Sequence, residues 1–251
     1  MELNKEYEKL YTMYFFIGLV GLLFGSVFIL ITFLSFRVFF DNPELVIEYF
    51  KTTSTNNIPQ KIHLYSMFGT LIANVFLVFI FSLLLFKPLK HDLIKFKSKW
   101  LRNVVIIVVG SILMKVGFIG VCYIYENLLG IDLSTTSLNQ ELIEQAIASP
   151  MAWAVFIAVV IIAPVLEEMI FRKCLFGMFQ DSFKVNRALT IFFSTLLFSF
   201  IHVLDFGSLH LIFLYVPYAL VLSLAYSYSD DNYYVPLTMH LINNLLGFFG
   251  I

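Results

Sequence analysis

The chain has 251 residues, of which 60% are hydrophobic and only 13% are charged, and its formal net charge is −1. Soluble domains carry about twice that share of charge and cannot bury so much apolar surface, so a soluble globular protein is excluded. The near-zero net charge gives no sign of nucleic-acid binding. The composition therefore predicts an integral membrane protein.

Seven apolar runs are long enough to cross a bilayer as helices. They are Tyr11–Phe36, Leu64–Phe86, Asn103–Tyr125, Ala152–Phe179, Ala188–Leu204, Leu209–Tyr228 and Tyr233–Gly250. The first is too long for the core of a signal peptide and is interpreted as a retained helix. The predicted fold class is all-α, a polytopic transmembrane bundle with about seven membrane-spanning helices.

The charges between these runs predict the orientation. The segment Lys87–Arg102 holds five lysines and one arginine, whereas Glu126–Trp153 holds neither residue type. By the positive-inside rule the first segment is a cytoplasmic loop, the second is external, and the N-terminus is cytoplasmic. The richness in Phe, Ile, Lys and Asn is typical of an AT-rich bacterial genome, so the expected location is a bacterial cell membrane. Membrane lipids are expected partners, because the cationic loop attracts anionic lipid.

The external segment contains a helix signal. Ser137 and Gln140 form a capping-box pattern, and apolar residues then recur at helical spacing as far as Ile147. This predicts a short amphipathic helix, Leu138–Ile147, on the outer surface. It is either a simple connection or a lid that guides substrate.

Ionisable and amide side chains interrupt three of the late apolar runs, where they are costly and usually functional. They are Glu167, Glu168, Arg172 and Lys173 in the fourth run, His202 in the fifth, and His240, Asn243 and Asn244 in the seventh. A rise of about 1.5 Å per residue places Glu167 and both histidines near the middle of the bilayer. Any one of them could serve only as an inter-helix hydrogen bond, but their common depth favours a shared site.

The two glutamates have different expected roles. Glu168 and Arg172 are four residues apart in the order that favours an intrahelical ion pair, which predicts a structural clamp. Neighbours on a helix point about 100° apart, so Glu167 is expected to face a different direction from Glu168. Pro164 lacks an N–H, which frees the carbonyl of Val160 and tends to kink the helix beside Glu167.

A carboxylate, two imidazoles and an amide can together hydrolyse a peptide bond. Glu167 would take a proton from water, and one histidine would hold that water or shuttle the proton. The other histidine and Asn244, which lies four residues after His240 on the same face, would donate to the oxyanion. Phe198, four residues before His202, would form a wall of the site.

Three short motifs carry a family resemblance. The segments "EEMIFR" (Glu167–Arg172), "FSFIH" (Phe198–His202) and "HLINN" (His240–Asn244) resemble, in order and spacing, those of the CAAX protease and bacteriocin-processing family of intramembrane proteases, relatives of the Ras-converting prenyl endopeptidase. The resemblance implies that Glu167 is the catalytic glutamate and that His202, His240 and Asn244 complete the site.

The resemblance also suggests a division of the chain. It covers about Met151 to Ile251, which would form a catalytic core with four transmembrane helices. Residues 1–150 match no family by their motifs and would form an N-terminal membrane region with three transmembrane helices and the external amphipathic segment.

Metal dependence stays open at this point. Glu167, His202 and His240 could together hold zinc. Asparagine is a poor zinc ligand, yet Asn244 shares a face with His240, which favours a mechanism without a metal or another cofactor. Cys122 and Cys174 show no metal-ligand spacing.

The predicted function is that of an intramembrane endopeptidase acting on a membrane-associated or lipidated peptide or protein. In a bacterium, where protein prenylation is not expected, processing of a peptide precursor is favoured. One alternative is a non-proteolytic scaffold or bacteriocin self-immunity protein on the same fold. Another is an ion or proton transporter, although the chain lacks the internal repeat that many transporters show.

Overall fold

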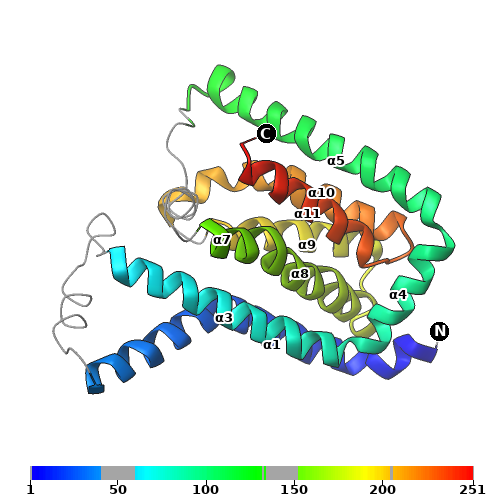
Figure 1. Ribbon diagram of the computed structural model, residues 1–251. Helices are drawn as coiled ribbons and strands as arrows, with labels where there is room; N and C mark the ends of the chain where they lie inside the picture. The colour runs from blue at the N-terminus through cyan, green and yellow to red at the C-terminus, as the bar shows by residue number, and fades with distance from the viewer. Residues whose placement is uncertain (1, 41–59, 132, 134–151, 204–205, 251) are drawn as a thin grey trace.

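The computed structural model describes residues 2–40, 60–131, 133, 152–203 and 206–250 (Figure 1). Every regular element among these residues is a helix, which confirms the predicted all-α class over the described part of the chain. The elements are α1 (Glu2–Phe40), α3 (Gln60–Leu84), α4 (Phe86–Ser98), α5 (Trp100–Tyr123), η2 (Ile124–Leu128), α7 (Ala152–Val155), η3 (Phe156–Ile162), α8 (Ala163–Glu168), η4 (Met169–Cys174), η5 (Gly177–Ser182), α9 (Arg187–Ile201), η6 (Phe206–Leu211), α10 (Ile212–Tyr228) and α11 (Tyr234–Phe248).

Several of these helices are suited to a membrane, but the predicted count of seven spans is not confirmed. Four helical stretches in the described residues are long and apolar enough to cross a bilayer, or five if the bent pair α3 and α4 counts as one span. The four are Glu6–Gly25, Trp100–Leu128, Ala152–Ser182 and Leu209–Tyr228. α9 and α11 have 15 residues each. At about 1.5 Å per residue they fall short of a hydrocarbon core roughly 30 Å thick.

The predicted cytoplasmic loop Lys87–Arg102 is instead mostly helix. α3 and α4 meet at an angle of 80°, and α4 lies across the end of the bundle between α3 and α5 (Figure 1). Pro88, Leu89 and Asp92 form the buried side of α4, while most of its lysines point outward. The excess of lysine suggested a loop, but these buried positions recur at helical spacing. The predicted external helix Leu138–Ile147 lies outside the described residues.

The stretch Ala152–Ser182, called here the 152–182 helix, occupies the centre of the bundle. In its most apolar segment of 18 residues, 56% is buried inside the protein, compared with 17–33% for the other three candidate spans. α1 and α3 pack on one side of it, and α9, α10 and α11 lie on the other (Figure 1). The side chains of Ile170, Phe171 and Cys174 are fully buried there. The helix that carries Glu167 and Glu168 is therefore the candidate span best screened from lipid.

α1 approaches the 152–182 helix closely at Gly177. A Cβ atom at this position would lie 2.2–2.7 Å from three ring atoms of the buried Tyr11. Small residues at such crossings let membrane helices come together. Gly177→Ala is therefore expected to lower the free energy of unfolding by about 1–3 kcal/mol, measured by thermal unfolding in detergent. Gly120→Ala is the matched control, because a Cβ there meets nothing within 4 Å. Equal stability of the two variants would contradict this packing.

Candidate active site

A widened turn precedes the two glutamates. In η3 the N–H of Ala163 donates to the carbonyl of Ala158, five residues earlier, as in a π-helix. The next donor in that pattern would be residue 164, which is a proline without an N–H. In this π-helical pattern the carbonyl of Val159 is left without a backbone donor, one residue before the Val160 carbonyl that an α-helical pattern predicts to be free. The Asn244 amide of α11 donates to the Val159 carbonyl at 2.9 Å (Nδ2 to O).

Glu168 and Arg172 form the predicted ion pair. Arg172 Nε lies 3.1 Å from Glu168 Oε2, and both side chains are completely buried. This contact is electrostatic, because the N–H does not point at the oxygen well enough for a hydrogen bond. Arg172 also donates from Nη2 to the Ala219 carbonyl of α10 at 3.3 Å, and its guanidinium lies 4.7 Å from the ring centroid of Phe198. The pair thus joins the 152–182 helix to α9 and α10.

His240 of α11 lies between both carboxylates. Its Nδ1 is 2.9 Å from Glu168 Oε1, and its Nε2 is 3.8 Å from Glu167 Oε2. The two glutamates therefore reach the same imidazole, which the different directions predicted for them did not suggest. Their side chains do diverge from the helix, but an imidazole presents a nitrogen on each of two edges and so reaches both. Glu168 has a double role, since it contacts Arg172 and His240 at once.

His202 and Phe198 complete the cluster from α9. His202 is the residue at which α9 ends, and its Nδ1 lies 2.8 Å from the Phe198 carbonyl. A carbonyl only accepts, so Nδ1 carries the proton and Nε2 of the neutral ring is an acceptor. The Phe198 ring is buried, with its centroid 4.7 Å from that of His202 and 5.8 Å from that of His240. Phe198 is thus the apolar surface that both imidazoles share.

The structure brings together Glu167, Glu168, Arg172, Phe198 and His240, with His202 against the same phenyl ring. Asn244 lies one helical turn beyond His240, and its amide contacts Val159 and Asn243. Its part in binding an oxyanion stays a prediction. No group of three or more His, Cys, Asp or Glu side chains among the described residues is spaced to hold a metal ion. Glu167, His202 and His240 as arranged therefore do not fit a zinc site.

Two comparisons with known proteins gave a match. Residues 149–246 match the sequence model of a family described as Rce1-like, type II CAAX prenyl endopeptidase Rce1-like. A curated relative, the membrane-embedded CAAX protease MroQ of Staphylococcus aureus (strain USA300), is 33% identical over 84 residues. The resemblance to CAAX proteases is confirmed. The match to this relative spans 34% of the present chain and 34% of the relative's length. No solved structure matches the chain.

Residues 149–246 are called here the Rce1-like region. A buried acid from outside this region contacts it, and the sequence did not predict this contact. Asp92 of α4 accepts hydrogen bonds at its Oδ2 from Lys173 Nζ, at 2.8 Å, and from the backbone N–H of Tyr233, at 3.0 Å. Its carbonyl accepts one from Asn232 Nδ2 at 2.7 Å. Asp92 therefore links the helix that carries Glu167 to the start of the helix that carries His240.

Tyr233 makes a second link between the same two helices. Its hydroxyl donates to the Val165 carbonyl at 3.0 Å, two residues before Glu167. Its ring is buried, so the bond is shielded from solvent. Neither Asp92 nor Tyr233 belongs to the three motifs. The one signal for Asp92 in the sequence was its place as a single acid in a lysine-rich segment.

Proposed function

We propose that the chain is an intramembrane endopeptidase in which Glu167 activates water for attack on a peptide bond. The observation that carries the proposal is the contrast between the two glutamates. Glu168 is fully buried and contacts both Arg172 and His240. The Glu167 side chain keeps 12% of its surface accessible, and its one ion-pair contact within the described part of the chain is the 3.8 Å approach to His240. Glu167 is thus the acid that water can reach.

The proposed reaction assigns one task to each group. Glu167 takes a proton from water while the water oxygen attacks the carbonyl carbon, and it then returns the proton to the leaving amine as the C–N bond breaks. His202 Nε2 accepts a hydrogen bond from the water and orients it. Asn244 donates to the oxyanion of the tetrahedral intermediate. Because Nδ1 of His240 already donates to Glu168, its Nε2 can donate there as well only in the form in which both ring nitrogens carry a proton. Glu168 and Arg172 position His240 and Phe198.

Two observations support a substrate class. The similar family and the similar protein are both named for CAAX sequences, and Glu167 lies in a helix suited to span the membrane. A CAAX sequence is a C-terminal motif that receives a prenyl chain. A glutamate in the most buried helix of a membrane protein suits a peptide bond held at the membrane by such a lipid or by its own apolar residues. We propose a membrane-associated or lipidated peptide, a bacterial cell membrane and a cytoplasmic N-terminus. A scaffold or immunity protein does not require these buried ionisable side chains around one site, so that alternative is not favoured.

Two fluorogenic peptides test this function. The purified chain in liposomes is mixed with an internally quenched peptide that ends in a farnesylated CAAX sequence, and with the same peptide without the lipid. We expect the farnesylated peptide to be cleaved faster, and cleavage to persist in excess chelator. If correctly folded protein cleaves neither peptide, the proposed substrate class is wrong. Activity that a chelator removes and zinc restores would instead decide for a metalloenzyme.

A further inference from the structure

α4 presents an exposed face that mixes apolar and cationic side chains. We call Phe86, Lys90, Leu93, Ile94 and Lys97 the outer face of α4, and all five are exposed. They follow the spacing of one helical side, three or four residues apart. The opposite side holds Asp92, which is fixed to the 152–182 helix and to the start of α11. The outer face is therefore held in place and turned away from the protein.

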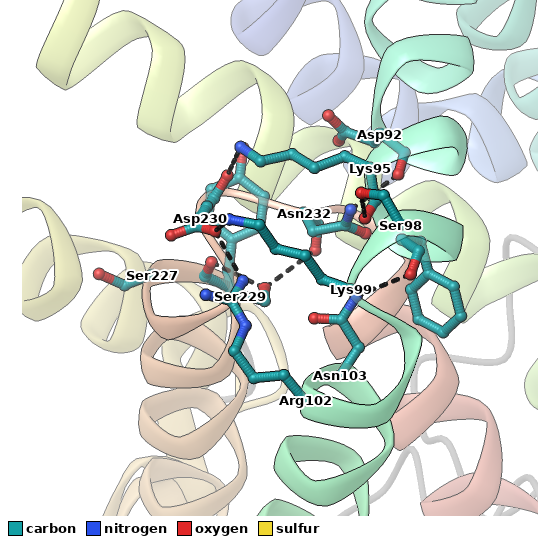
Figure 2. Close-up of polar contacts among 12 residues, drawn as sticks. Asp92, Lys95, Ser98, Lys99, Arg102, Asn103, Ser227, Ser229, Asp230 and Asn232 are labelled. Atoms are coloured by element: carbon teal, nitrogen blue, oxygen red, sulfur yellow. Dashed lines mark hydrogen bonds and ion pairs between the residues drawn. The ribbon is translucent and has the colours of Figure 1, made fainter.

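Most other cations at this end of the bundle already have a hydrogen-bond partner in the protein. Lys99 and Arg102 bind Asp230 Oδ2 at 2.8 and 2.6 Å, and Lys95 binds the Asp230 carbonyl at 2.7 Å (Figure 2). The hydrogen bonds from Arg102 and Lys99 hold the pKa of Asp230 well below its usual range, so it is ionised at neutral pH. Lys87, Lys184 and Arg187 likewise pair with Glu6, Glu8 and Asp231. Within the described part of the chain, Lys90 and Lys97 have no acidic partner.

The position of α4 matches a membrane surface. Its 80° bend from α3 turns it across the end of the bundle, so that it runs along the bilayer plane if α3 crosses it (Figure 1). Exposed apolar side chains continue from the outer face onto both neighbours, with Leu83 on α3 and Trp100 and Leu101 on α5. Tryptophan is enriched at the membrane interface.

We propose that the outer face of α4 binds anionic phospholipid. Phe86, Leu93 and Ile94 insert at the boundary between headgroups and acyl chains, and Lys90 and Lys97 extend to the phosphates, as in amphipathic helices that lie in the interface. A soluble anion would use the two lysines but leave the apolar side chains in water. The apolar surface is continuous with that of α3 and α5, which favours a bilayer as the occupant. This surface lies outside the Rce1-like region and does not depend on the proposed cleavage.

The two tryptophans permit a direct test. Trp153→Phe leaves Trp100, beside the end of α4, as a single fluorescent reporter. The full chain is placed in liposomes that contain brominated phosphatidylglycerol or the same mole fraction of brominated phosphatidylcholine. We expect stronger quenching of Trp100 by the anionic lipid. Each lysine near an anionic surface favours it by about five-fold, so Lys90→Gln/Lys97→Gln should lose most of this excess.

Lys184→Gln is the matched control, because Lys184 is exposed at the same end but pairs with Glu8. It should keep the excess quenching, and added salt should reduce it in both the control and the parent protein. Equal quenching by the two lipids in the parent protein would overturn the proposal. Protection of Trp100 from both lipids, increasing with protein concentration, would also overturn it and indicate a second copy of the chain on this face.

Discussion

Glu167→Gln is expected to abolish peptide cleavage while the protein stays folded. Glutamine keeps the size and shape of glutamate but cannot take a proton from water. Loss of a general base costs about 10²- to 10⁴-fold in rate. The measurement is the initial cleavage rate in liposomes, beside thermal unfolding of the same preparation. The stability should change little, because Glu167 makes no close ion pair and its contact to His240 is 3.8 Å long.

The matched control is Glu126→Gln, which removes an exposed carboxylate far along the chain from the three motifs. It should retain both stability and activity. Cleavage by Glu167→Gln at the parent rate would exclude Glu167 as the base. If Glu167→Gln unfolds instead, the residue has a structural role that the long contact to His240 does not suggest.

Glu168→Ala should have the largest effect on stability. It leaves the guanidinium of Arg172 completely buried without its counter-ion and removes the partner of His240 Nδ1. Breaking a buried ion pair from one side costs about 3–5 kcal/mol. We expect a clearly lower unfolding temperature and a poor yield of folded protein, measured in detergent beside the exposed control Glu126→Ala.

A double variant separates the ion pair from the other contacts of Glu168. Glu168→Leu/Arg172→Met replaces both charges by apolar side chains, which is often tolerated in a protein interior. It should recover much of the stability that Glu168→Ala loses, but not the activity, because His240 Nδ1 stays without the Glu168 carboxylate that positions it. If Glu168→Ala is as stable as the parent protein, the clamp interpretation is wrong.

The sequence predicted contacts that depend on local spacing. The i,i+4 spacing of Glu168 and Arg172 predicted their ion pair, since a helix brings such positions together whatever surrounds them. The same spacing placed Phe198 beside His202. It did not predict His240 between two carboxylates, because that contact depends on how α11 packs against the 152–182 helix.

Features that depend on tertiary structure were missed or misplaced. α4 was interpreted as a loop, since its lysines obscured the helical spacing of Leu89 and Asp92. The hydrogen bond from Asn244 to the Val159 carbonyl was not predicted, because the π-helical turn that leaves this carbonyl free has no signature in the sequence. The link between Asp92, Lys173 and Tyr233 joins residues 81 and 141 positions apart, which no local pattern reports.

Asp92 has a consequence for grafting the Rce1-like region into another protein. Residues 149–246 contain Lys173 and Tyr233 but not the acid that both contact. A chimera built from this region alone would bury an ammonium group without a counter-ion and leave the backbone N–H of Tyr233 without its acceptor. The division at residue 150 stays a prediction, but it is not a safe fusion point. A functional graft must include α4 or place another carboxylate at the position of Asp92.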